Sequence, residues 1–215
     1  MAELLQPPGR IIETEADLAE GAAWLAGICP VWARVMPDLS PLPLRRRPDG
    51  FEAIAGAIVA QQISVAAATS IWARMEHAGL TLPDRIAQAS DDDMRAVGLS
   101  RPKIRYLRAI AETQPDWGRL RELPDKDAIA ALVALPGIGQ WTAEIYLKFA
   151  LGRADVFAAG DLALQEAAKL LYGLDARPSP AELRQMAEAW RPWRAVAARG
   201  LWAYYRQIKG REGIR

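Results

Sequence analysis

The chain turns at Leu135-Pro136-Gly137-Ile138-Gly139-Gln140-Trp141-Thr142-Ala143, between two segments of helical composition, residues 125–134 and 140–151. Gly137 and Gly139 lie on either side of one aliphatic residue, so the backbone can turn sharply there and form a helix–hairpin–helix. Such a turn leaves peptide N–H groups exposed at the N-terminus of the second helix, where the helix dipole also favours an anion. The stretch therefore predicts sequence-independent binding of a DNA backbone phosphate, with an ordinary turn between helices as the alternative.

The remainder of the chain is also expected to be helical. Its commonest residues favour helices, and no segment alternates Val, Ile or Thr in the manner of a strand. Four prolines predict a stiff connection without regular structure: Pro37, Pro41, Pro43 and Pro48. Further helices are predicted at about residues 15–27, 50–60, 65–78, 91–97, 101–113, 162–172, 180–190 and 193–209.

These elements predict an all-α fold, with two helical lobes around a cleft and a helix–hairpin–helix DNA-binding motif. The sequence contains no evident internal repeat and no long flexible linker, so residues 1–215 are expected to form a single unit. The central lobe is expected to cover about residues 50–152, with the hairpin at 135–139. The second lobe is expected to combine about residues 1–45 with residues 155–215.

Composition excludes several classes of protein. Of the 215 residues, 51% are hydrophobic and 25% are charged, which is typical of a folded chain rather than a disordered one. The single cysteine, Cys29, excludes internal disulfides and iron–sulfur clusters, and the single histidine, His77, disfavours histidine-based zinc sites and Ser/His or Cys/His catalytic pairs. No apolar run reaches the roughly 18 residues of a membrane span. A soluble cytoplasmic protein is expected, associated with the nucleoid if the source is bacterial, because the N-terminus also lacks a signal peptide.

Charge is unevenly distributed along the chain. The formal net charge of +1 does not by itself indicate a nucleic-acid partner. Residues 191–215, however, carry seven basic side chains against one acidic side chain, and smaller basic clusters occur at Arg45–Arg47 and between Arg101 and Arg108. Such patches suit a polyanion, with an ordinary solvated surface as the alternative.

Acidic residues mark the starts of two predicted helices. Asp91–Asp93 follow Ser90 and lack the spaced partners of a metal site, so they are interpreted as a capped helix start, and no metal site is predicted. Asp161 follows Gly160 and opens the segment 162–172. A helix N-terminus favours an ionised carboxylate, which is the state required of a base or of a group that stabilises an oxocarbenium ion. Asp161 can therefore be both a helix cap and a catalytic residue.

Together these motifs resemble the helix-hairpin-helix DNA glycosylase superfamily. The resemblance lies in Pro136-Gly137-Ile138-Gly139, Trp141-Thr142-Ala143, Gly160-Asp161 and Gln61-Gln62-Ile63-Ser64. Within the superfamily, most of residues 45–210 resemble the 3-methyladenine DNA glycosylase II branch. Ala158 departs from the pattern, since relatives often have proline there, and it is expected to loosen the loop before Asp161. Only 60 residues precede Gln61, which indicates the short form without an N-terminal β domain.

The resemblance implies an enzyme of base-excision repair. Members of this superfamily bind damaged double-stranded DNA, flip a nucleotide out of the duplex and cleave its N-glycosidic bond, and Asp161 occupies the position of their essential aspartate. Bifunctional glycosylase/lyases of the superfamily carry a Schiff-base lysine directly after the hairpin, whereas this chain has Trp141. The resemblance therefore implies a monofunctional glycosylase for alkylated bases of the 3-methyladenine type, which leaves an abasic site.

Other functions remain open at this point. The chain could be a glycosylase/lyase for oxidised bases that uses a different amine. It could also be a non-catalytic helix-hairpin-helix protein that recognises DNA structure, although such a protein has no need of Asp161. A third alternative is an interaction scaffold whose tryptophans are core residues, which predicts no salt-dependent DNA binding.

The segment after the hairpin places polar residues on one side of a helix. Gln140, Glu144 and Lys148 recur every four residues and predict a polar stripe, with Glu144 placed to pair with Lys148. Trp141 borders that stripe, so it need not lie in the deep core.

Aromatic residues are candidates for the substrate-base pocket. Trp202 and Tyr205 lie about 100° from the main apolar face of the last predicted helix. By family position, Trp141 and Trp202 would line the pocket, with Tyr205 beside them. Electron-rich indoles stack well on a base made cationic by alkylation, with burial in the core as the alternative.

The resemblance also assigns residues to DNA binding. The junction at Gln61 and Gln62 would reach into the minor groove, with Gln62 as the wedge that fills the gap left by the flipped base; a merely polar junction is the alternative. The candidate DNA-binding residues are Gln61, Gln62, Ser64, Pro136, Gly137, Ile138, Gly139 and Thr142, with Lys103, Arg105 and Arg194 as phosphate contacts. The chemistry requires no cofactor, although the resemblance admits a monovalent cation between hairpin carbonyls and phosphate. A monomer that does not associate with membranes is expected.

Overall fold

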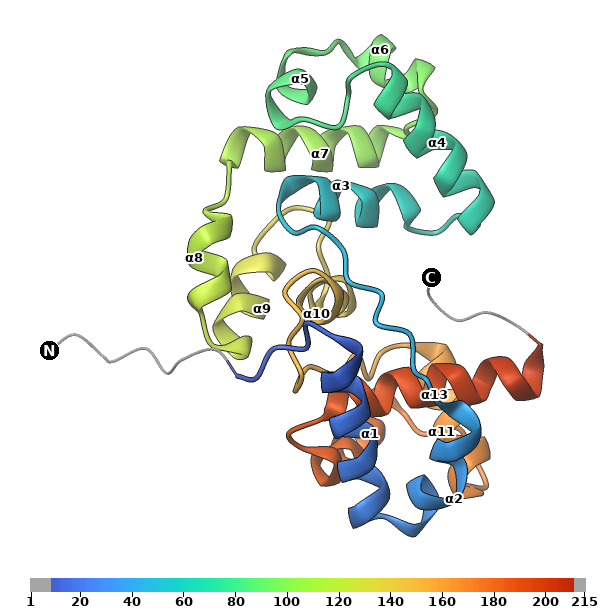
Figure 1. Ribbon diagram of the computed structural model, residues 1–215. Coiled ribbons are helices and arrows are strands. Elements are labelled where there is room, and N and C mark those ends of the chain that lie inside the picture. Colours follow the sequence, from blue (N-terminus) through green and yellow to red (C-terminus); the bar gives the residue numbers. More distant parts are fainter. Residues whose placement is uncertain (1–8, 211–215) are drawn as a thin grey trace, which may run out of the picture. The chain divides into compact units, whose positions relative to one another are not determined.

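The computed structural model describes residues 9–210 and is helical throughout that range (Figure 1). The described residues form no strand, apart from an isolated bridge between Ile11 and Arg153, so the predicted all-α fold is confirmed. The helices are α1 (Glu15–Ile28), α2 (Pro30–Leu39), α3 (Phe51–Ala60), α4 (Val65–His77), α5 (Pro83–Gln88), α6 (Asp91–Ala96), α7 (Arg101–Thr113), α8 (Trp117–Glu122), α9 (Asp125–Val133), α10 (Gln140–Phe149), α11 (Leu162–Tyr172), α12 (Pro180–Ala187) and α13 (Arg194–Lys209), with a 3₁₀ turn at Glu188–Trp190.

Three of these helices, α2, α5 and α8, were not expected from the sequence pattern. Pro37 lies inside α2, so the prediction of a connection without regular structure is wrong for this residue. The helix buries Trp32, Met36 and Leu39. Burial of this apolar face offsets the hydrogen bond that Pro37 cannot donate, and the helix ends two residues later.

The chain folds as two compact units. Of the described residues, unit 1 comprises 47–146, and unit 2 comprises 9–46 together with 147–210. The chain therefore passes from unit 1 to unit 2 within α10.

Unit 1 is organised around α7. This helix packs against α3, α5 and α6, and its amphipathic pattern turns Ile104, Leu107 and Ile110 into the core. The hairpin between α9 and α10 belongs to the same unit, as does the junction between α3 and α4.

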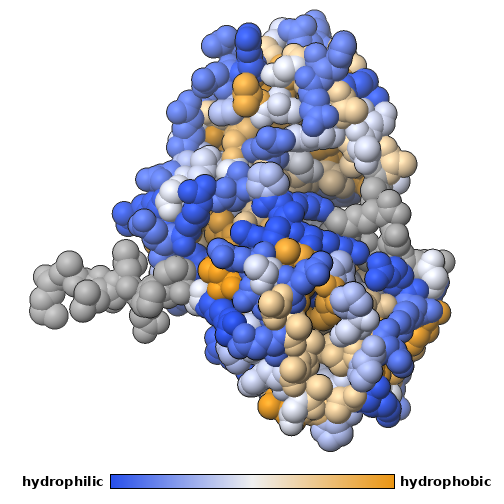
Figure 2. All heavy atoms as spheres, in the orientation of Figure 1, coloured by the Kyte–Doolittle hydropathy of each residue, from blue (hydrophilic) through white to orange (hydrophobic). Residues whose placement is uncertain are grey.

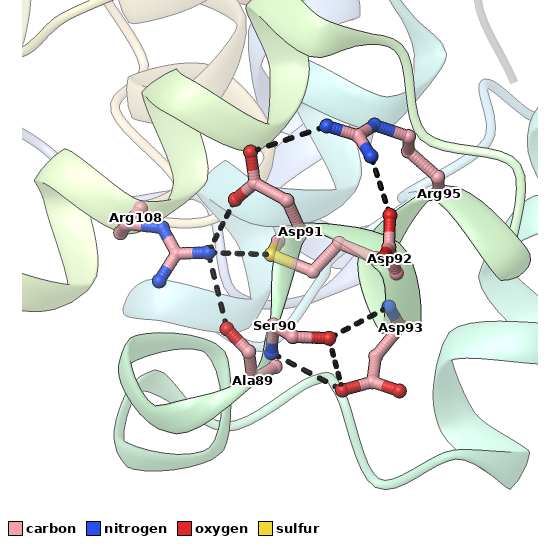
Figure 3. Close-up of polar contacts among 8 residues, drawn as sticks. Ala89, Ser90, Asp91, Asp92, Asp93, Arg95 and Arg108 are labelled. Atoms are coloured by element: carbon pink, nitrogen blue, oxygen red, sulfur yellow. Dashed lines mark hydrogen bonds and ion pairs between the residues drawn. The ribbon is translucent and has the colours of Figure 1, made fainter.

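The acidic run of unit 1 begins α6, as predicted. Ser90 Oγ accepts a hydrogen bond from the Asp93 N–H, and the Asp93 carboxylate accepts one from the Ser90 N–H, both at 3.1 Å. Figure 3 shows that Arg108 contacts Asp91 and the carbonyl of Ala89, while Arg95 pairs with Asp91 and Asp92. The three aspartates thus form a helix cap and exposed ion pairs.

Unit 2 is organised around α13, which packs against α1, α2 and α11. Two glycines allow the close approach of these helices. A Cβ on Gly21 of α1 would lie 2.7 Å from both Trp193 and Val196, and a Cβ on Gly200 of α13 would lie 2.8 Å from the Trp32 ring. The N-terminus of α13 also binds the loop that precedes α11, because the Ala195 N–H donates to the Ala154 carbonyl at 2.8 Å.

No helix within residues 9–210 is long and apolar enough to cross a membrane. On the face drawn in Figure 2, hydrophobic residues occur singly or in small groups among hydrophilic ones.

Candidate active site and nucleic-acid interface

The hairpin of unit 1 is held by buried aliphatic side chains and by one obligatory glycine. The Ile138 N–H donates to the Leu135 carbonyl at 3.2 Å, and both side chains are buried. Gly137 has a φ of +81°, and a Cβ there would lie 2.4 Å from the ring of Tyr106. Gly139 is different, because it is exposed and a Cβ there would meet no atom within 4 Å. Nothing within the fold requires glycine at 139, and the backbone there is open to an approaching group.

Helix α10 begins directly after Gly139 and has the geometry of an anion-binding helix N-terminus. The Ala143 N–H donates to the Gly139 carbonyl at 3.0 Å, which is the first hydrogen bond of the helix. The N–H groups of Gln140, Trp141 and Thr142 therefore precede the helical hydrogen-bond ladder. Of the predicted hairpin residues, Pro136 is exposed and the Thr142 side chain is buried. N–H groups in this position, together with the helix dipole, suit a phosphate oxygen.

The junction between α3 and α4 is bonded to the hairpin. Gln61 Nε2 donates to the Gly137 carbonyl at 2.9 Å, a contact that the sequence pattern did not indicate. Gln62 is exposed and has a φ of +59°, a left-handed conformation that non-glycine residues rarely adopt. Such strain is typical of functional loops. Ser64 caps α4 by accepting from the Ala67 N–H at 3.2 Å.

The three cations predicted to contact phosphate have different surroundings. Lys103 Nζ donates to the Val59 carbonyl at 2.7 Å, and partial burial lowers the pKa of this lysine. Arg105 is exposed, with its guanidinium carbon 5.3 Å from the centre of the Tyr106 ring. Arg194, in unit 2, forms two hydrogen bonds to Asp155 and one to Glu188, and its side chain is only 13% exposed. Arg105 is therefore the most accessible of the three.

Asp161 lies in unit 2 at the N-terminus of α11, where it is 6% exposed. Its Oδ1 accepts hydrogen bonds from the N–H groups of Ala163 at 2.9 Å and Leu164 at 3.0 Å. The same oxygen accepts a third hydrogen bond from Trp202 Nε1 at 3.2 Å. The predicted cap is thus confirmed, and three N–H donors at the positive end of a helix dipole surround one carboxylate oxygen.

The loop before Asp161 is buried and well bonded. Ala158 and Ala159 are both fully buried. The Asp161 N–H donates to the Ala158 carbonyl at 3.0 Å, and Gln165 Nε2 donates to the Ala159 carbonyl at 2.9 Å. Hydrogen bonds and burial therefore hold this loop, and the expected loosening by Ala158 stays a prediction.

Trp202 is a core residue of unit 2 and is only 4% exposed. Its indole stacks against Phe149, with ring centroids 5.8 Å apart and planes 22° apart. Lys148 Nζ lies 4.5 Å from the centre of the indole and 5.7 Å from that of Phe157. The indole is therefore packed against side chains of its own unit, and its N–H is directed at Asp161.

The polar stripe predicted on α10 is buried. Gln140 Nε2 donates to Glu144 Oε1 at 2.8 Å, but Glu144 and Lys148 are only 1% and 0% exposed. All residues from Thr142 to Phe149 are buried, so α10 is covered on every face and the four-residue period does not mark a solvent-facing side. A lone lysine within the apolar run 145–150 was the signal that could have indicated a buried cation.

The predicted base-pocket residues belong to both units. Trp141, in unit 1, is 37% exposed, which agrees with its predicted place outside the deep core. Tyr205 lies half-buried on α13 of unit 2, the helix that also carries Trp202. The pocket that these residues are expected to form stays a prediction.

Comparison with known proteins gives consistent matches across most of the chain. DNA-3-methyladenine glycosylase 1 of Schizosaccharomyces pombe is 28% identical over 202 residues, which cover 88% of this chain and 89% of that protein. The solved structure of the Schizosaccharomyces pombe 3-methyladenine DNA glycosylase in complex with abasic DNA matches with a TM-score of 0.77 and 27% identity, covering 91% of this chain and all of that one. A DNA-3-methyladenine glycosidase from Bacillus halodurans matches with a TM-score of 0.78 and 30% identity, covering 94% and 95% of the two chains.

The sequence profile of the family described as "HhH-GPD superfamily base excision DNA repair protein" matches residues 55–192. That range includes the junction at Gln61, the hairpin and Asp161. The chain therefore belongs to the HhH-GPD superfamily of base excision DNA repair proteins.

Proposed function

We propose that this chain is a monofunctional DNA glycosylase of the 3-methyladenine class. It binds damaged double-stranded DNA, flips an alkylated base out of the duplex and hydrolyses the N-glycosidic bond, leaving an abasic site. The observation that carries this proposal is the Asp161 carboxylate, held by three N–H donors on one oxygen at the start of α11. The names of the similar proteins support the substrate class, and the neighbour bound to abasic DNA supports the product.

Asp161 acts on the sugar rather than on the base. An alkylated purine such as 3-methyladenine is already cationic, so it leaves as a neutral molecule when the C1′–N bond breaks and both bonding electrons go to the base. No general acid is required for that step, in keeping with a chain that has a single histidine. The deoxyribose becomes an oxocarbenium-like cation, which a fixed negative carboxylate stabilises. Water then adds to C1′ and loses a proton, with Asp161 as the base.

Unit 1 supplies sequence-independent contacts to DNA. The N–H groups at the start of α10 bind a backbone phosphate, and the open backbone at Gly139 allows that phosphate to approach closely. The exposed, strained Gln62 is the wedge, since its side chain can fill the gap left by the flipped base and hydrogen-bond the orphaned partner base. Trp141 is exposed enough to stack on the cationic base.

Trp202 has a different role in this proposal. Because its indole is packed against Phe149 and beneath Lys148, it positions Asp161 through Nε1. The protein acts as a monomer.

A monovalent cation can assist DNA binding at the hairpin. Backbone carbonyls there have the hard oxygen atoms that such ions prefer, and two of them, at Leu135 and Gly137, each accept one hydrogen bond and keep a second lone pair. A cation at these carbonyls would supply positive charge next to the bound phosphate. The hydrolysis itself needs no cofactor.

The test is base release from methylated duplex DNA by the wild type and by Asp161→Asn, with alkali used to break abasic sites. The wild type is expected to yield breaks that depend on alkali, and the variant is expected to bind the same DNA without releasing bases. Treatment with borohydride is expected to trap no covalent complex. A trapped complex contradicts the monofunctional assignment, and wild-type binding without base release identifies a non-catalytic DNA-binding protein.

A further inference from the structure

Unit 2 contains a small cavity lined by three arginines. Its volume is about 10 Å³, enough for one atom of the size of a water oxygen. Arg45 lines it from the segment after α2, and Arg199 and Arg206 line it from α13. The aromatic rings of Phe149 and Trp202 form an apolar wall. A cavity with this lining concentrates positive charge beside an apolar surface.

Arg199 is a buried cation at this cavity. It is 2% exposed, donates to the carbonyls of Ala195 at 3.1 Å and Leu44 at 3.2 Å, and lies 5.0 Å above the Phe149 ring. Burial, with the nearby charges of Arg46 and Arg45, lowers the pKa of Arg199 to about 10, so the guanidinium remains charged at neutral pH.

The charge of Arg199 lacks an acidic counterpart. Within residues 9–210, no carboxylate forms an ion pair with Arg46, Arg199 or Arg206, and the buried Nε of Arg199 has no hydrogen-bond partner. Buried charges in proteins are normally paired, because moving a charged group out of water without a partner of opposite charge has a high free-energy cost. Like charges gathered around an unsatisfied buried donor therefore favour an anionic ligand.

Backbone strain at the rim of the cavity is a separate observation. Arg45 has a φ of +49°, in the left-handed region that arginine rarely adopts. The conformation is unfavourable for residues other than glycine and persists only where the surroundings enforce it, often at ligand sites. The strained residue is one of the three arginines that line the cavity.

We propose that this cavity binds a phosphate group of the DNA backbone. One phosphoryl oxygen enters the cavity towards Arg199, and the remaining oxygens lie between the guanidinium groups of Arg45 and Arg206. Guanidinium groups match the geometry of phosphate oxygens, so two arginines can hold one phosphate firmly.

The position of Trp202 indicates which phosphate this is. Its indole lines the cavity and also donates Nε1 to Asp161. The sugar on which Asp161 acts is joined to a phosphate on each side, so a phosphate bound against the same indole belongs to the flipped nucleotide or its neighbour. This inference rests on the proposed function, and it assigns to unit 2 a DNA contact separate from the hairpin of unit 1.

The test compares two double variants in binding, as salt is varied, to a duplex that contains one stable abasic-site analogue, because this DNA presents the base-free sugar of the flipped nucleotide and has no base to release. Arg45→Asn with Arg206→Gln removes the two outer guanidinium groups, since Asn tolerates the positive φ at position 45 and Arg199 is retained. Arg34→Gln with Arg177→Gln is the matched control, because both residues are exposed in unit 2 and do not line the cavity. Circular dichroism checks that both variants keep the wild-type helicity and melting temperature.

Log affinity falls linearly with log salt, and each phosphate contact contributes about 0.9 to the steepness of that fall. The cavity variant is expected to have a slope that is shallower than that of the wild type by this amount, and the control is expected to change less. Equal slopes for wild type and cavity variant overturn the proposal, as does an equal loss in the control. Inorganic phosphate provides a second arm, and it is expected to raise the melting temperature of the wild type but not of the cavity variant. Stabilisation by inorganic phosphate with an unchanged DNA slope identifies a site for free phosphate and rejects the DNA contact.

DNA with no base to release keeps this test separate from catalysis. A wild type that releases no base, but whose salt slope depends on Arg45 and Arg206, refutes the proposed function and leaves the phosphate site standing.

Discussion

At Asp161 the hydrogen bonds to one carboxylate oxygen come from two sources. The N–H groups of Ala163 and Leu164 belong to the first turn of α11 and are what any aspartate cap receives. The third donor, Trp202 Nε1, comes from α13, 41 positions further along the chain. A cap does not need this bond, so its effect is to fix the orientation of the carboxylate relative to α13.

Trp202→Phe tests this orientation, because it removes the N–H donor and keeps an aromatic ring next to Phe149. We expect single-turnover base release to slow by about 10- to 100-fold, since a hydrogen bond to a charged group contributes about 1.5–3 kcal/mol. Duplex affinity is expected to stay at the wild-type value. Trp190→Phe is the control, because Trp190 is also buried in unit 2 and its ring packs against Trp32, Phe157 and Tyr172. An equal slowing in both variants contradicts the positioning role of Trp202.

At the scale of elements, the hairpin contains two glycines that are present for different reasons. Gly137→Ala is expected to destabilise unit 1 by about 2–4 kcal/mol, because it combines a positive φ with a steric clash against a neighbouring aromatic ring. In this protein the clash is with the Tyr106 ring, 2.4 Å from the added Cβ. Urea unfolding measures the loss. A stability within about 0.5 kcal/mol of the wild type would show that the turn adapts to a side chain.

Gly139→Ala is expected to have the opposite profile. Its Cβ meets no atom of the protein and its φ is not in the left-handed region, so stability is expected to change by less than about 0.5 kcal/mol. Affinity for duplex DNA is expected to fall about tenfold, because a methyl group would stand between the N–H groups of α10 and a phosphate. A duplex titration by fluorescence anisotropy, paired with the unfolding curve, separates the two glycines. Unchanged affinity would remove the hairpin from the DNA interface.

The sequence predicted those elements that have strong local signals. The hairpin, the caps at Ser90 and Asp161, and the long amphipathic helix α7 all follow from glycine spacing, capping residues and apolar periodicity. Helices α5 and α8, of six residues each, are too short for a periodic pattern, and α2 contains a proline that ordinarily ends a helix.

The candidate site was less predictable, because its contacts join distant parts of the sequence. Asp161 could be found from its place after glycine at a helix start. Its bond to Trp202, and the bond of Gln61 to Gly137, connect residues 41 and 76 positions apart and depend on tertiary packing. The four-residue period of Gln140, Glu144 and Lys148 suggested a solvent-facing stripe, but a helix covered on every face has no such side.

Within residues 9–210, three capping boxes link the stability of the protein to pH. Asp17 lies in the first turn of α1, Asp93 in that of α6 and Glu182 in that of α12, so the boxes occur in both units. Hydrogen bonds from the backbone of Thr14 and Glu13 lower the pKa of Asp17 to about 2, and hydrogen bonds from Ser90 and Ser179 lower the pKa values of Asp93 and Glu182. Each of these carboxylates therefore binds a proton less readily in the folded protein than in the unfolded chain.

The sign of the pH dependence follows from these lowered pKa values. The stabilisation is fully present above the pKa of the unfolded carboxyl, and it is lost as the pH falls through the folded value, between about pH 4 and pH 2 for Asp17. We therefore expect the free energy of unfolding to be nearly constant from pH 7 to pH 5 and to fall steeply below about pH 4. The Asp17→Asn variant is expected to be less stable than the wild type at pH 7, and its free energy of unfolding is expected to fall less steeply as the pH is lowered. The control is Asp175→Asn, which removes an exposed carboxylate in a loop and is expected to keep the wild-type dependence of stability on pH. Urea unfolding between pH 2 and pH 7 measures both slopes, and parallel curves for wild type and Asp17→Asn would show that this capping box does not contribute to acid sensitivity.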